Sequence, residues 1–132
     1  MRRVNQIVLT VDEANRLATA ANPHLHRLAL ILLDNVIEIQ LRRKANVEFA
    51  FDKTYWFSGV RKHNKKRRWQ VSRFHAELLK LAVEQQWITE NDSKVLDFAH
   101  RLRNKTYHEG FSEDETELTL GITLLFLSLI HI

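Results

Sequence analysis

Cysteine is absent from the 132-residue sequence, so disulfide bonds and thiolate chemistry are excluded for this chain. A chain without disulfides fits a reducing compartment, and we expect a cytoplasmic protein. The opening residues MRRVNQIVLTVDEAN contain no apolar run long enough for a signal peptide. The last residues, LSLIHI, end without a polar stretch, which leaves open whether the chain is a fragment of a longer protein.

Glycine and proline are also scarce, with three residues and one residue, and this favours helices joined by short turns. Apolar residues make up 45% and charged residues 27% of the chain, as in globular proteins. We expect one domain over residues 1–132, because no Gly- or Ser-rich linker divides the chain. The most apolar segment, Leu118–Ile132, is too short to span a bilayer comfortably, so no membrane association is expected.

Helix-start and helix-stop signals predict an all-α fold of four to five helices. Thr10 and Glu13 have capping-box spacing and predict the start of a first helix that ends at Asn22–Pro23. A second helix follows Pro23, and residues 46–59 either extend it or form a loop packed on it. The other predicted helices are Trp69–Gln86, a helix from a Thr89/Asp92 cap to about His108, and a buried final helix after the Ser112/Glu115 capping-box spacing.

Apolar periodicity assigns an inward side to the second and third helices. In the second helix, Asp34 and Glu38 fall on other faces than the apolar stripe. The predicted stripe consists of Leu25, Leu28, Leu32, Val36 and Ile39. The inward residues predicted for the third helix are Val71, Phe74, Leu78 and Leu81.

The fourth helix ends on RLRNKTYHEG, residues 101–110, which crowds basic and polar side chains into its last turns. At 100° per residue, Arg103 and Tyr107 lie on the flank between a core side and a polar side. The predicted core side contains Val95, Phe98, Ala99, Leu102 and Thr106. The predicted polar side, directly opposite, contains Asp97, His100, Asn104 and His108 and should face solvent or a partner.

Arg103 and His108 are five residues apart and would diverge on one rigid helix. They can converge on one phosphate if the last turn of the helix loosens at Glu109–Gly110. They can also converge if a two-fold symmetric partner presents the same polar side of its own helix across an interface, and we favour this second option. Asn104 lies four residues before His108, so its amide can orient the imidazole. The helix C-terminus favours the protonated form of that imidazole.

The RNKTYH segment, Arg103 to His108, resembles the motif of the HEPN superfamily of helical nucleases, in which an Arg, a polar follower and a His close a helix. The second helix, HLHRLALILLDNVIE, is also similar to the long early helix of such domains. The resemblance implies a HEPN-like four- to five-helix bundle, a symmetric homodimer with its site at the interface, and metal-independent cleavage of RNA. It also implies a toxin–antitoxin or phage-defence role, in many cases with an antitoxin protein as partner.

The residue types suit RNA cleavage by the substrate's own 2′-hydroxyl, which requires a base, an acid and a cation for the charge on phosphate. His108 can act as base or acid, Arg103 can hold phosphate oxygens, and Asn104 completes the predicted catalytic set. No cofactor is expected, and no metal site, because His24 and His26 form no convincing ligand set.

Four further residues are candidates for supporting this site. In several HEPN families an acidic residue on an early helix approaches the Arg–His pair, so the resemblance implies this role for Asp34 or Glu38. Ion pairs with Arg27 or Arg42 explain the two carboxylates equally well. The other two candidates are His100, which could instead pair with Asp97, and Tyr107, which could stack a base or simply pack.

The chain is basic, with a net charge of +4, and a second candidate surface for RNA is the charge run RKHNKKRR. Basic side chains beside aromatic ones suit a single-stranded backbone with splayed bases. The predicted RNA-binding residues are Arg61, Lys62, Lys65, Lys66, Arg67, Arg68 and Trp69. A solvated loop or a docking patch for an acidic antitoxin explains the run as well.

Two other readings of the whole chain stay open. The bare Arg–His spacing also fits Arg68 with His75 and Arg101 with His108, and cations at a helix end often only complement its dipole. The chain could therefore be an inactive HEPN-like module for dimerisation or partner binding, or a basic RNA-binding domain.

Overall fold

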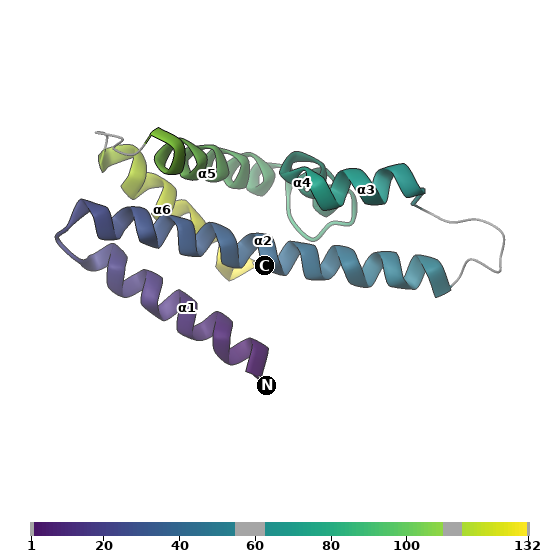
Figure 1. Cartoon of the computed structure of the whole chain (residues 1–132), viewed down its shortest axis with the longest axis horizontal. Helices are drawn as coiled ribbons and strands as arrows, with labels where there is room; N and C mark the ends of the chain where they lie inside the picture. Colours follow the sequence, from purple (N-terminus) through teal and green to yellow (C-terminus); the bar gives the residue numbers. More distant parts are fainter. Residues whose placement is uncertain (1, 55–62, 110–114, 132) are drawn as a thin grey trace. The chain divides into compact units, whose positions relative to one another are not determined.

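The computed structural model describes residues 2–54, 63–109 and 115–131, and within these ranges it leaves out the side chains of 2–4, 23, 53–54, 106–109, 115–118 and 128–131. The described residues form six α-helices and no strand, so the all-α prediction is confirmed and the predicted number of helices is corrected (Figure 1). The helices are α1 (Arg2–Thr19), α2 (Pro23–Thr54), α3 (Lys65–Arg73), α4 (His75–Glu84), α5 (Glu90–Glu109) and α6 (Glu115–His131).

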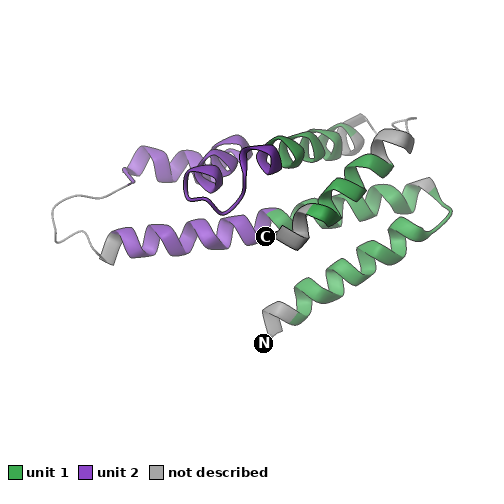
Figure 2. Cartoon of the chain, turned by 180° about the vertical axis from the view of Figure 1, so that it is seen from behind, with its two compact units in different colours: residues 1–37, 94–132 green, residues 38–93 purple. Residues whose placement is uncertain are grey.

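Packing divides the chain into two compact units (Figure 2). Unit 1 comprises residues 1–37 and 94–132, and unit 2 comprises residues 38–93. The long helix α2 runs from unit 1 into unit 2, and α5 begins in unit 2 and continues in unit 1. The expectation of a single folding domain stays a prediction.

The first helix starts earlier than the capping-box spacing predicted. Thr10 lies inside α1, where its hydroxyl donates to the Gln6 carbonyl at 2.7 Å. Glu13 accepts a hydrogen bond from Arg16 Nε at 3.0 Å, and this contact lowers the pKa of the Glu13 carboxyl. The prediction failed because a threonine can satisfy its hydroxyl within a helix as readily as at a cap.

The predicted third helix is two helices, α3 and α4, separated at Phe74. The backbone of Phe74 is extended (φ −116°, ψ 125°), although neither glycine nor proline marks the break. Leu78 and Leu81 are buried as predicted, whereas Phe74 is 51% exposed and the inward prediction for it is wrong. Asn64 caps the start of α3 by accepting from the backbone N–H of Arg67 at 2.7 Å.

The predicted cap of α5 is confirmed. The backbone N–H of Thr89 donates to Asp92 Oδ2 at 3.0 Å, and the backbone N–H of Asp92 donates to the Thr89 hydroxyl at 3.1 Å. The open segment from residue 46 continues α2 as far as Thr54. The predicted Ser112 cap lies outside the described residues, but a helix does follow it, α6.

The buried side of α2 in unit 1 differs from the predicted stripe. Ala29, Leu30 and Leu33 are fully buried, whereas Leu28, from the predicted stripe, is 49% exposed. Apolar residues occur on nearly every side of this part of α2, so periodicity could not select the face that packs. The selected face includes Asp34, which is only 3% exposed.

Helix α6 approaches its neighbours in unit 1 at Gly121. A Cβ atom at this position would lie 2.8 Å from Leu102 Cδ2 on α5 and 3.5 Å from Leu30 Cδ1 on α2. Ile122 and Leu125 are buried, while Leu127 is 53% exposed, so α6 is buried along one side. None of the helices, over the residues described, is long and apolar enough to cross a membrane.

We expect Gly121→Leu to lower the free energy of unfolding by about 1–3 kcal/mol, because the larger side chain overpacks the contact with Leu102. Urea denaturation followed by circular dichroism measures the change. Thr123→Leu is the control, since Thr123 is exposed on the same helix. Equal losses in the two variants would show that close packing at Gly121 does not matter.

Candidate active site on α2 and α5

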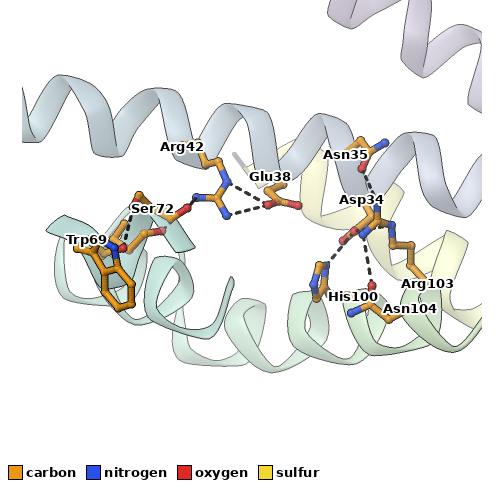
Figure 3. Close-up of polar contacts among 10 residues, drawn as sticks. Asp34, Asn35, Glu38, Arg42, Trp69, Ser72, His100, Arg103 and Asn104 are labelled. Atoms are coloured by element: carbon orange, nitrogen blue, oxygen red, sulfur yellow. Dashed lines mark hydrogen bonds and ion pairs between the residues drawn. The ribbon is translucent and has the colours of Figure 1, made fainter. Parts of the chain in front are cut away.

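Asp34 is the centre of a polar cluster inside unit 1. Its carboxylate is buried, and its Oδ2 atom lies 3.0 Å from Nδ1 of His100 on α5 (Figure 3). The His100 side chain is 16% exposed. A buried carboxylate needs such partners, because desolvation of an unpaired charge is costly.

Arg103 is the second α5 residue that reaches this carboxylate. Its Nε atom lies 3.7 Å from Asp34 Oδ2, which is an ion-pair distance without a hydrogen bond. One terminal nitrogen donates to Asn35 Oδ1 and the other to Asn104 Oδ1, both at 3.3 Å (Figure 3). Side chains from two helices therefore hold the guanidinium, and the Arg103 side chain as a whole is 25% exposed.

The spacing of the residues explains why the cluster forms. His100 and Arg103 are three residues apart on α5 and therefore share one face of that helix. Asp34 and Asn35 are adjacent on α2, so they reach different nitrogens of the same guanidinium. The contacts of Asp34 and Asn35 with α5 join residues far apart in the chain and depend on the packing of α2 with α5 in unit 1.

The predicted sides of α5 need correction. Ala99 and Leu102 are buried as predicted, but Leu96 is also buried and Phe98 is 36% exposed. His100 is largely buried at its contact with Asp34 and so does not lie directly opposite the core. The apolar pattern of α5 alone could not predict this, because the burial of a polar side chain depends on a partner, here a buried carboxylate on a facing helix.

The cluster has two chemical properties that suit work on phosphate. The contact of Nδ1 with the Asp34 carboxylate holds the His100 ring in one orientation on the face of α5 that also carries Arg103. Each terminal nitrogen of Arg103 carries two N–H groups, and one hydrogen bond at each leaves a second donor. A guanidinium in a fixed orientation with donors to spare can bind phosphate oxygens without reorganising.

The structure brings together several predicted site residues and separates others. Asp34 forms an ion pair with Arg103, as was predicted for either Asp34 or Glu38. Glu38 instead pairs with Arg42 on the same helix at 2.9 Å, which was the other explanation offered for it. His100 pairs with Asp34 and not with Asp97, which forms an ion pair with Arg101. The side chains of Tyr107 and His108 lie outside the described part of the structure.

Asn35 was missed by the sequence prediction. Asp34 and Asn35 together interrupt the apolar run LALILL–VIEI of α2. Two adjacent polar residues inside such a run are a usable signal, because buried polar groups require partners. Apolar periodicity considers only the apolar residues and therefore does not detect this pair of polar residues.

In the described part of the charge run RKHNKKRR, residues 65–68 open α3 in unit 2, and two of its arginines are held by other residues. Arg67 pairs with Glu84 at 2.9 Å, and Arg68 donates to the His63 carbonyl at 2.8 Å. His63 is buried and contacts Glu48 at 3.3 Å through Nε2. Of the other predicted RNA-binding residues, Lys65, Lys66 and Trp69 are exposed on α3. Arg61 and Lys62 lie outside the described residues.

Comparison with known proteins assigns no family. No known family model matches the sequence, and neither a curated protein nor a solved structure matches the chain. The resemblance to HEPN nucleases therefore depends on the Arg103–His108 motif and the α2 sequence.

Proposed function

We propose that this protein is a metal-independent endoribonuclease of HEPN type that acts as a homodimer. The observation that supports the proposal best is the Arg103 guanidinium, held by Asp34, Asn35 and Asn104 while remaining partly exposed. An arginine needed only as a surface cation would require no such support from a second helix. A toxin–antitoxin or phage-defence role, with an antitoxin partner, belongs to the same proposal.

In the proposed reaction, Arg103 donates its remaining N–H groups to the non-bridging oxygens of one phosphate. An imidazole removes the proton of the 2′-hydroxyl, the 2′-oxygen attacks phosphorus, and the bond from phosphorus to the 5′-oxygen breaks. A second imidazole protonates the leaving 5′-oxygen. The products carry a 2′,3′-cyclic phosphate and a 5′-hydroxyl.

His108 supplies these imidazoles in the proposal, one from each subunit of a symmetric dimer. A composite site thereby provides the acid and the base at the same time. His100 is a positioning residue, because it shares the Asp34 carboxylate with Arg103. We therefore expect His100→Ala to act on the placement of the guanidinium rather than on proton transfer.

The test is incubation of the purified wild-type chain, with EDTA present, with a panel of single-stranded RNAs and tRNAs. We expect cleavage and 3′ ends that accept an adapter only after enzymatic removal of the cyclic phosphate. Mass spectrometry first confirms that no partner protein has co-purified. Intact RNA after incubation with partner-free protein, or cleavage that requires added Mg²⁺, would contradict the proposal.

A second candidate function is RNA binding through α3 without cleavage. The observation that favours it is the exposure of Lys65, Lys66 and Trp69 on one short helix. Charge reversal at Lys65 and Lys66 should abolish RNA binding under this reading. Substitution of Arg103 should then leave every property of the RNA complex unchanged.

A further inference from the structure

We propose that one face of α3, formed by Lys65, Trp69 and Arg73 and called here the Trp69 face, binds single-stranded RNA by stacking an unpaired base on the indole. The inference rests on the proposed function, from which it takes RNA as the ligand. It adds that the RNA is single-stranded and that a base contacts the indole. It concerns unit 2 alone, to which all these residues belong.

The three residues follow one line along α3. They are spaced by four, so successive side chains lie one above the other on the helix surface. Val71, which is 1% exposed, marks the buried side of α3. At 100° per residue, Trp69 and Arg73 each lie about 160° from Val71. The Trp69 face therefore points away from the packed side of its helix.

The Trp69 ring is exposed, but contacts with neighbouring side chains fix its orientation. Trp69 is 53% exposed, and its ring packs edge-on against Phe74, whose centroid is 5.9 Å away. The Arg73 guanidinium lies over the indole ring, 5.7 Å from its centroid, and this cation–π contact also holds the ring in place. The extended residue at the α3–α4 break places Phe74 beside Trp69 instead of in the core. A flat ring held in one orientation is what base stacking requires.

The charges beside the indole are available to phosphate. Arg67 and Arg68 are engaged by Glu84 and by the His63 carbonyl. In contrast, no carboxylate among the described residues pairs with Lys65, Lys66 or Arg73. On α3, Lys65 lies one turn before Trp69 and Arg73 one turn after it, so their backbone positions are about 12 Å apart along the helix axis. Cations on both sides of an aromatic platform suit a backbone that runs past a stacked base.

A single strand fits this face better than the other polyanions. In a duplex the base faces are covered by their neighbours, so the indole would gain no contact. An acidic peptide would pair with the lysines and arginines but would not need a flat exposed ring. Because stacking is tolerant of base identity, we expect little sequence preference from this contact.

The test is fluorescence anisotropy with a fluorescein-labelled 12-nucleotide single-stranded RNA, using the full-length His108→Ala chain so that the RNA is not cleaved. Trp69→Ala in this background should weaken binding about tenfold or more. Trp69→Phe, which keeps a smaller ring, should restore most of the affinity. Arg73→Gln should lower the slope of log Kd against log salt by about one.

Phe51→Ala is the matched control, because Phe51 is 57% exposed on α2 in the same unit. It should leave the affinity unchanged, and thermal melting should show that every variant is folded. Binding within twofold of the parent for Trp69→Ala would overturn the proposal. Equal competition by a duplex of the same sequence, or an equal loss of binding to poly-glutamate in Trp69→Ala, would overturn it as well.

Failure of this inference can be distinguished from failure of the proposed nuclease. If the wild-type chain cleaves RNA while Trp69→Ala binds and cleaves normally, the stacking site is wrong and the nuclease stands. If Trp69→Ala loses binding but no RNA is ever cleaved, the stacking site stands and the nuclease is wrong.

Discussion

Arg103→Ala is expected to reduce RNA cleavage by about 10²–10³-fold, since it removes the cation that stabilises charge on phosphate in the transition state. Arg103→Lys should restore only a small part of the activity, because a single ammonium cannot reproduce the paired N–H groups that Asn35 and Asn104 orient. Initial rates on one labelled RNA, measured in EDTA, give the effect. RNA affinity should change much less than the rate.

Arg101→Ala is the matched control for this prediction. Arg101 lies two residues away on α5, its side chain is 76% exposed, and its ion pair is with Asp97 on the same helix. This variant should retain the wild-type rate. If Arg101→Ala and Arg103→Ala lose equal activity, the effect is one of general positive charge and the proposed role of Arg103 is wrong.

Mixing wild type with an inactive variant tests whether the site is shared between subunits. A heterodimer of wild type and His108→Ala keeps both guanidiniums but only one of the two imidazoles that the proposed reaction uses as base and acid. We therefore expect an excess of His108→Ala to lower the rate toward that of the variant after the two proteins are mixed and allowed to exchange subunits. If heterodimers form and retain roughly half of the wild-type rate, each subunit has a site of its own and the composite site is excluded.

Asp34→Ala is expected to lower the free energy of unfolding by about 2–3 kcal/mol, because it removes the buried carboxylate that His100 and Arg103 share. Breaking a fully buried pair costs more, about 3–5 kcal/mol, but Arg103 is partly exposed and can recover some hydration. The melting temperature should fall by roughly 5–15 °C. Chemical denaturation followed by circular dichroism gives the free energy directly.

Two variants control for the charge and for the loss of a carboxylate in general. Asp34→Asn keeps the volume and an acceptor for His100, so it should lose less stability than Asp34→Ala. Asp97→Ala removes a carboxylate whose partner Arg101 is largely exposed, and its effect should stay within about 0.5 kcal/mol. An Asp34→Ala protein as stable as Asp97→Ala would mean that the polar cluster contributes nothing to the fold.

The loss of Asp34 should also reduce activity in a protein that is still folded. At a temperature well below its melting point, Asp34→Ala should cleave more slowly than wild type because Arg103 is no longer oriented. This separates a positioning role from a purely structural one. A folded Asp34→Ala protein with the wild-type rate would remove Asp34 from the proposed site.

Local sequence signals predicted some features of this protein correctly. Thr89 and Asp92 cap α5 as their spacing indicated, because both hydrogen bonds of a capping box form between neighbours in the chain. The same spacing at Thr10 and Glu13 was misleading, because a local pattern cannot tell a cap from a helix interior. The break at Phe74 carried no local signal at all.

By itself, the amino-acid sequence determined the all-helical class, the cap of α5 and the final helix after the Ser112/Glu115 spacing, since each depends on contacts within a few residues. Only the tertiary structure decided which side of α2 is buried, and hence that Asp34 meets His100 and Arg103. Those contacts join residues more than 60 positions apart. The period of a helix determines which residues share a face. Which face packs, and against which helix, depends on the shape and charge of the rest of the chain.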